Sequence, residues 1–204
     1  IVHGGAQAAL ALARSPIDLL SFTGGPQAGL ALKRASGLVR CLMELGGNDP
    51  LFVLPDADLD LAASTAIGHR YEIAGQSCAA VKKLYVHDDV AEAFTAILLD
   101  KVAAHRFGDP SLAEIQMGPV IDGPAADTIM QRLADAQAAG ARLLAGGTRE
   151  GNLIAPTVIA GVEPAMPLIA QETFGPVLAL RQFAELDAAM AEVNASDYGL
   201  QAGI

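Results

Sequence analysis

Short apolar segments alternate with longer amphipathic ones along almost the whole chain, and this alternation limits the folds that it can adopt. The apolar runs have the length of strands, whereas the longer segments have the spacing of helices with one apolar face. Strands are predicted over residues 17–22, 38–45, 50–54, 81–86, 142–145, 158–159 and 176–183. Helices are predicted over residues 6–14, 26–35, 56–67, 88–105, 125–139 and 186–194. Strands separated by helices predict an α/β fold with a mostly parallel sheet.

The composition is that of a globular protein with a large apolar core. The chain has 204 residues, of which 52% are hydrophobic and 4% aromatic, so aliphatic side chains must fill the interior. The net charge of −10 argues against a nucleic-acid partner, because phosphate binding requires a basic surface. No apolar run reaches the roughly 18 residues of a membrane-spanning helix, so no membrane partner is expected.

The number and spacing of the cysteine and histidine residues indicate the cellular compartment and whether a metal site is expected. Two Cys residues are too few for a disulfide scaffold, which predicts a cytoplasmic protein. The four His residues are far apart and match no ligand spacing, so no metal site is expected. The chain opens on Ile1 without the charged segment of a signal peptide, and we expect it to be a fragment of a longer protein.

Cys78 is the first candidate for a reactive side chain. It ends the stretch Gly75-Gln76-Ser77-Cys78, whose small and polar residues allow a ligand to approach closely. A free Cys is commonly an inert, buried residue, and Cys41 fits that description because it lies among apolar neighbours in a predicted strand. A reactive thiol needs partial exposure, which the neighbours of Cys78 favour.

Glu44 is the second candidate, because it is a carboxylate at the end of an apolar run and just before Gly46-Gly47. A buried, unpaired carboxylate is costly, so Glu44 should be paired, exposed or functional. In a catalytic site it could act as a general base. Alternatively, it faces solvent from one side of a strand.

Two further segments could bind a ligand. Gly24 and Gly25 lie between a predicted strand and a predicted helix, where backbone N–H groups can hold a phosphate, although the spacing differs from G-x-G-x-x-G. Glu172 precedes Phe174-Gly175, so its carboxylate could bind a ribose diol while the ring packs on a flat group. Each segment could equally be an ordinary turn.

The order of these motifs is more specific than any one of them. Along the chain stand Phe22-Thr23-Gly24-Gly25, Glu44-Leu45-Gly46-Gly47, Gly75-Gln76-Ser77-Cys78, Glu172-Thr173-Phe174-Gly175-Pro176-Val177, and Asn194 with Tyr198-Gly199-Leu200. This series resembles the NAD(P)-dependent aldehyde dehydrogenase superfamily over nearly the whole chain.

The resemblance implies a fold and a division of the chain. Residues 1–45 would be the C-terminal part of a Rossmann-like NAD(P)-binding domain, and residues 46–204 a three-layer α/β/α catalytic domain. The substrate would be a small aldehyde, the cofactor NAD or NADP, and the full-length protein a homodimer or homotetramer. The oxyanion-hole Asn of the family would lie upstream of Ile1, so we expect the isolated chain to have little activity.

The resemblance also implies roles for matching residues. Cys78 would be the nucleophile that forms a thiohemiacetal and then a thioester, and its backbone N–H would supply half of the oxyanion hole. Glu44 would activate the water that hydrolyses the thioester.

The residues implied for the cofactor are Gly24, Gly25, Leu45, Gly46, Glu172 and Phe174. The glycines at 24 and 25 would lie by the pyrophosphate, Leu45 and Gly46 near the nicotinamide, and Glu172 on the nicotinamide ribose with Phe174 beside it. Many relatives carry Ser where this chain has Gly25.

Two other functions fit the same motifs. A CoA-acylating semialdehyde dehydrogenase would pass the thioester to a thiol, but acylating members commonly lack the base that Glu44 would provide. A non-catalytic binding module is disfavoured because Cys78, Glu44 and Glu172 occur together. The segments around Glu44 and Cys78 look most like phosphonoacetaldehyde or succinate-semialdehyde members. Their anionic substrates would need an Arg near the thiol, whereas here Ser77 precedes Cys78 and Arg70 is eight positions away.

Overall fold

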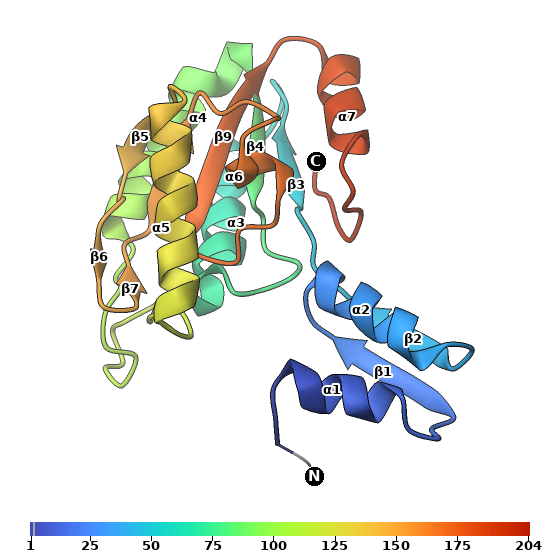
Figure 1. The fold of residues 1–204 in the computed structure, drawn as a ribbon. Coiled ribbons are helices and arrows are strands. Elements are labelled where there is room, and N and C mark those ends of the chain that lie inside the picture. The colour runs from blue at the N-terminus through green and yellow to red at the C-terminus, as the bar shows by residue number, and fades with distance from the viewer. Residues whose placement is uncertain (2) are drawn as a thin grey trace. The chain divides into compact units, whose positions relative to one another are not determined.

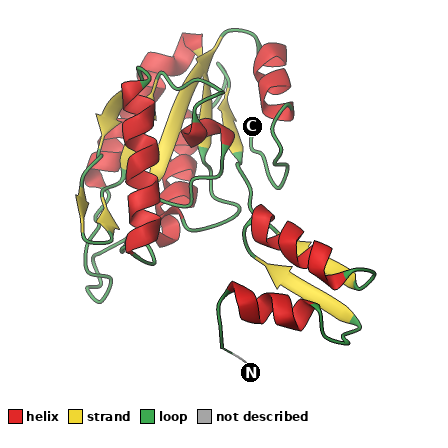
Figure 2. Ribbon diagram, in the orientation of Figure 1, coloured by secondary structure: helices red, strands yellow, loops and turns green. Residues whose placement is uncertain are grey.

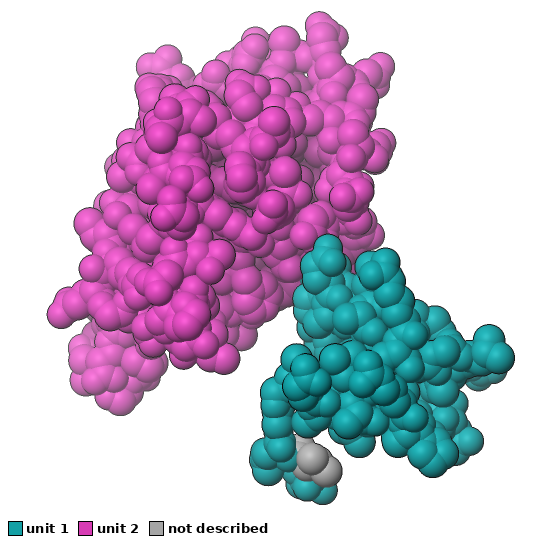
Figure 3. Space-filling model, viewed as in Figure 1, with its two compact units in different colours: residues 1–46 teal, residues 47–204 magenta. Residues whose placement is uncertain are grey.

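The structure is a computed structural model that describes residue 1 and residues 3–204. The chain divides into two compact units, Ile1–Gly46 and Gly47–Ile204, which are coloured separately in Figure 3. The division falls between Gly46 and Gly47. The functional roles predicted for the two halves of the chain stay predictions.

The first unit contains a parallel strand pair connected by a helix. Its elements are α1 (Ala6–Ala13), β1 (Leu19–Thr23), α2 (Pro26–Ser36) and β2 (Arg40–Glu44). Strands β1 and β2 pair in parallel from Leu19 opposite Arg40 to Thr23 opposite Glu44, and α2 is the crossover that parallel pairing requires. Pro26 begins α2, where its missing N–H costs no helical hydrogen bond.

The second unit is built on a five-stranded sheet in the order β3-β4-β9-β8-β5 (Figure 1). The strands are β3 (Pro50–Val53), β4 (Lys83–His87), β5 (Arg142–Ala145), β8 (Thr157–Ala160) and β9 (Val177–Phe183). The pairs β3–β4, β4–β9 and β8–β9 are parallel, and only the pairing of edge strand β5 with β8 is antiparallel. The predicted α/β fold with a mostly parallel sheet is therefore confirmed.

Helices cover both faces of this sheet (Figure 2). In Figure 1, α5 lies in front of the sheet, and α3 and α4 lie behind it. The bounds are α3 (Leu59–Tyr71), α4 (Asp88–Ala104), α5 (Gly123–Ala138), α6 (Pro167–Ala170) and α7 (Leu186–Asn194), with a short 3₁₀ turn η1 (Glu72–Gly75) after α3. The main core joins α3, α4 and α5 to the central strands, and a smaller aromatic cluster joins α7 to β3, β4 and β9.

Local chemistry explains where the elements differ from the predicted bounds. Helix α3 begins at Leu59 rather than at residue 56, because the Asp58 carboxylate accepts the Leu61 N–H at 3.0 Å and caps the helix. The helix then continues to Tyr71, which is fully buried. The two-residue strands β6 (Arg149–Glu150) and β7 (Leu153–Ile154) and the four-residue helix α6 are too short to give a periodic signal.

Candidate active site

Cys78 is an exposed residue on the otherwise half-buried or buried loop that joins η1 to β4. The loop is entered through a left-handed stretch in which Ile73, Ala74 and Gly75 have φ of 50°, 55° and 71°. Such values are unusual for non-glycine residues and are a genuine outlier for a β-branched one. Strained backbone of this kind concentrates at functional sites.

Gly75 is a point of contact between this loop and the segment after α6. A Cβ atom at residue 75 would lie 2.3 Å from the carbonyl oxygen of Gly175. On the other side of the loop, the Gln76 side chain donates to the Ile73 carbonyl (2.9 Å) and accepts the Ile121 N–H (2.8 Å). The nucleophile candidate therefore follows a segment that is fixed from both sides.

Lys82 anchors the loop beyond Cys78. Its side chain is 3% exposed, and its ammonium donates to the carbonyl oxygens of Ser77 (3.0 Å), Cys78 (2.7 Å) and Ala80 (3.2 Å). The same Nζ lies 3.6 Å from Oε1 of Glu172. Burial lowers the pKa of Lys82 and the nearby Arg70 lowers it further, whereas Asp49 and Glu172 oppose both effects.

The Glu172 carboxylate lies against this anchored loop. Its Oε1 accepts the Gly47 N–H at 3.2 Å, and its backbone N–H donates to the Tyr198 hydroxyl at 3.3 Å. Gly47 has no room for a side chain, because a Cβ there would lie 2.5 Å from the Cys78 carbonyl oxygen. The structure thus brings two predicted site residues, Cys78 and Glu172, onto neighbouring segments.

Two arginines hold the segment that carries Glu172. From α5, Arg132 donates to the Glu172 carbonyl, to Thr173 Oγ1 (3.1 Å) and to Gln171 Oε1 (2.9 Å). At the end of α3, the buried Arg70 donates to the Thr173 carbonyl at 2.7 Å. Arg70 is 0% exposed and burial lowers its pKa to about 10, so it does not face a substrate and supports the architecture instead.

Glu172 and Phe174 are both partly exposed, and their binding of a nicotinamide cofactor stays a prediction. The Glu172 side chain is 12% exposed, so a carboxylate oxygen remains reachable from solvent. Phe174 is 45% exposed.

The remaining candidates belong to the first unit. Glu44 is exposed at the end of β2, and its carbonyl accepts the Gly24 N–H at 3.0 Å. Gly25 is the N-cap of α2 and has open space around its Cα, so a Ser would fit there. Leu45 packs against Gly29, where a Cβ would lie 2.6 Å from Leu45 Cδ2, and half-buried Gly46 ends the unit. The approach of Glu44 to Cys78 stays a prediction.

Three charged residues of the site were not predicted from the sequence. They are Lys82, Arg132 and Asp49. Asp49 is 2% exposed, and burial raises the pKa of its carboxyl group. Asp49 Oδ1 accepts the Gln201 N–H at 3.3 Å. The sequence signal that could have identified Lys82 is the Lys82-Lys83 pair near the start of a predicted strand. Lysines in a buried strand are rare unless they are paired with an opposite charge.

Metal and membrane sites do not emerge from the described residues. Within residues 3–204, no group of His, Cys, Asp and Glu could hold a metal ion. No helix of this part of the chain has the length and apolarity to span a bilayer.

Comparison with known proteins decides the family. The model of the aldehyde dehydrogenase family matches residues 1–204. The chain belongs to the aldehyde dehydrogenase family. This confirms the resemblance inferred from the ordered motifs.

Aldehyde dehydrogenases of several specificities are similar to the chain. The sulfoacetaldehyde dehydrogenase of Neptuniibacter caesariensis is 40% identical over 192 residues, which are 94% of this chain and 42% of that protein. The chain therefore spans less than half the length of this curated relative.

Solved structures reproduce the fold. The NADP-dependent glyceraldehyde-3-phosphate dehydrogenase from Bacillus halodurans C-125, complexed with NADP, is 38% identical with a TM-score of 0.94, over 98% of this chain and 42% of that one. The NAD-dependent aldehyde dehydrogenase from Sinorhizobium meliloti is 37% identical with a TM-score of 0.92, over 96% of this chain and 40% of that one. Family members with either cofactor thus share this architecture.

Proposed function

We propose that the protein carrying this chain oxidises a small aldehyde to the carboxylic acid with NAD(P)⁺, and that Cys78 is the nucleophile. The observation that carries the proposal is an exposed thiol on a loop anchored beside Glu172, with Lys82 in contact with both segments. Family membership supports the reaction class.

In the proposed reaction, a thiolate attacks the aldehyde first and a water molecule attacks the resulting thioester later. The Cys78 thiolate attacks the aldehyde carbon, and the carbonyl electron pair moves to oxygen as a C–S bond forms. The Cys78 N–H would donate to that oxygen. After oxidation to the thioester, Glu44 would take a proton from water, whose attack breaks the C–S bond and releases the acid and the thiolate.

NAD(P)⁺, when bound, accepts the hydride that converts the thiohemiacetal into the thioester. Glu172 would hold its nicotinamide ribose, because a carboxylate oxygen is exposed beside Phe174. From the first unit, Gly24 and Gly25 would lie by the pyrophosphate, and Leu45 and Gly46 near the nicotinamide. The N-cap of α2 at Gly25 supports the pyrophosphate assignment, because N–H groups at a helix start favour an anion.

We propose a small aldehyde with a negatively charged group as the first substrate to test. The support is the 40% identical sulfoacetaldehyde dehydrogenase. Because Arg70 is buried, the cation for such a group must come from another residue. A panel of sulfoacetaldehyde, phosphonoacetaldehyde, succinate semialdehyde and an uncharged aldehyde, each with NAD⁺ and NADP⁺, tests this directly.

The catalytic roles are tested by Cys78→Ala and Glu44→Gln in the whole protein, with Cys41→Ala as the matched control. Cys78→Ala should abolish NAD(P)H formation, whereas Cys41→Ala should leave it unchanged, because Cys41 is half-buried beside Ser36 in the first unit. Glu44→Gln should give a rapid burst of NAD(P)H without steady turnover. Normal turnover of Cys78→Ala would refute the covalent mechanism.

Coenzyme A distinguishes hydrolysis from acyl transfer. A hydrolytic enzyme should release free acid at a rate independent of CoA, because Glu44 supplies activated water. Formation of acyl-CoA, with turnover that requires CoA, would identify the acylating alternative.

A further inference from the structure

We infer that Lys82 is a positioning residue that orients the Cys78 N–H as an oxyanion donor. The inference rests on the function proposed above, in which Cys78 is the nucleophile. It arises from the three hydrogen bonds that one buried ammonium makes to the nucleophile loop.

The bond to Ser77 determines where the Cys78 N–H points. The Ser77 carbonyl and the Cys78 N–H belong to one planar trans peptide group, so they point in opposite directions. The Ser77 carbonyl accepts Lys82 Nζ at 3.0 Å and the Ala80 N–H at 3.3 Å. These two donors fix the peptide plane with the Cys78 N–H turned away from Lys82.

The outward N–H is free to bind an oxyanion. Within residues 3–204, no hydrogen bond uses the Cys78 N–H as donor. Rotating the peptide by half a turn would aim this N–H at the ammonium and remove one of its acceptors. Because Lys82 is 3% exposed, water could not easily replace that acceptor, so the flipped peptide is disfavoured.

Only a lysine meets this geometry with one side chain. The ammonium presents three donors from a single point, and here all three have carbonyl acceptors on residues 77–80. Arginine presents a planar fork, which cannot converge in the same way. The 3.6 Å separation from Glu172 Oε1 gives the charge a partner and ties the anchor to the cofactor segment.

Lys83 provides a matched control on the neighbouring position. It is 4% exposed, and burial lowers its pKa as it does for Lys82. In the described residues, its ammonium makes no hydrogen bond to the nucleophile loop. Lys83→Met therefore removes an equally buried charge without touching the Ser77 peptide.

Two rate constants measured on the whole protein, for the NAD(P)H burst and for alkylation of Cys78, distinguish loss of the Cys78 N–H orientation from disorder of the whole loop. In the Glu44→Gln background, which serves as the parent, the burst of NAD(P)H reports a step that develops an oxyanion, whereas alkylation of Cys78 by iodoacetamide at high pH is a displacement that develops none. Lys82→Met should slow the burst by about 100-fold, as loss of an oxyanion donor does. Its plateau alkylation rate should stay within about threefold of the parent, and Lys83→Met should change neither rate by more than that.

The burst and alkylation rates of the Lys82 variants can each contradict the inference. A folded Lys82→Met enzyme with a parental burst, or with burst and alkylation slowed together, would overturn the inference. If Lys82→Met does not fold, Lys82→Arg keeps the charge and should still slow the burst selectively, so a parental Lys82→Arg burst would also overturn it. Retained turnover in Cys78→Ala would instead refute the proposed function.

Discussion

Replacing Gly75 by Ala should damage both stability and catalysis, because this glycine lies where the Cys78 loop meets the segment after α6. Its φ is 71°, and an added Cβ would lie 2.3 Å from the Gly175 oxygen, 2.6 Å from the Gly175 carbonyl carbon and 2.9 Å from the Arg70 oxygen. All three are backbone atoms, so no flexible side chain can move aside.

The magnitude follows from two contributions. The left-handed backbone costs an Ala residue about 1 kcal/mol, and steric overlap in a packed site costs about 1–3 kcal/mol. We therefore expect a loss of about 2–4 kcal/mol in the free energy of unfolding. Relieving the overlap would move the two segments apart by roughly 1 Å, a displacement that can reduce turnover by about 100-fold.

The assay is urea denaturation and steady-state NAD(P)H formation, with Gly68→Ala as control. Gly68 lies in the nearby helix α3 with nothing within 4 Å of an added Cβ, so this change should stabilise the protein by about 0.5–1 kcal/mol without affecting turnover. A Gly75→Ala protein within about 0.5 kcal/mol of the parent and equally active would refute the reasoning.

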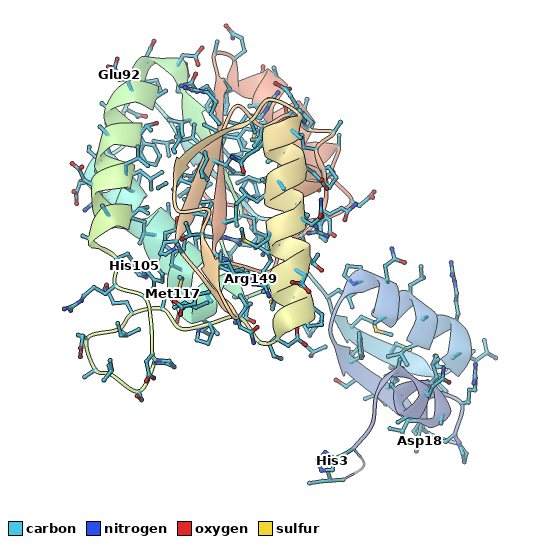
Figure 4. All side chains as sticks on the ribbon, turned by 60° about the vertical axis from the view of Figure 1, so that its left-hand side comes forward. His3, Asp18, Glu92, His105, Met117 and Arg149 are labelled. Atoms are coloured by element: carbon cyan, nitrogen blue, oxygen red, sulfur yellow. The ribbon has the colours of Figure 1, made fainter. Side chains whose placement is uncertain are left out.

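Two other substitutions test backbone strain and burial. Ile73 is 66% exposed and has a φ of 50°. Because Asn tolerates left-handed backbone better than Ile, Ile73→Asn should raise the free energy of unfolding by about 1 kcal/mol. The control Ile121→Asn, at another exposed position, should change the free energy of unfolding by no more than about 0.5 kcal/mol. His105, which follows α4 near Met117 (Figure 4), packs on Tyr71. Its Nε2 is buried without a hydrogen-bond partner among the described residues, and burial lowers its pKa from the ordinary value of 6.5. Protonation of His105 therefore favours the unfolded chain, and the free energy of unfolding should fall as the pH drops below about 6.5. His105→Phe should reduce this dependence of stability on pH. An unchanged pH dependence would contradict the role given to His105.

The sequence predicted the fold class because each strand and helix carries its own local signal. The ends were less predictable, as at α3, where Asp58 and not Asp56 caps the helix. The candidate thiol and the Glu172 segment were predicted from ordered motifs, which carry more information than any single residue.

The contacts that arrange the site could not be predicted in the same way. Lys82, immediately before β4, contacts Glu172, which precedes β9, because β9 pairs with β4 in the sheet. Arg132 contacts the Glu172 segment because α5 packs over the same sheet. Such pairings depend on sheet order, which sequence periodicity does not encode. Arg70 illustrates the consequence, because its place in the sequence did not show that it is buried and holds the Thr173 carbonyl.

The covalent mechanism can be tested by mass spectrometry of the Cys78 peptide from the Glu44→Gln enzyme, quenched after mixing with aldehyde and NAD(P)⁺. We expect an acyl adduct on Cys78 that accumulates with the NAD(P)H burst and is absent without cofactor. NAD(P)H formation with an unmodified Cys78 peptide, or an adduct on Cys41 instead, would contradict it.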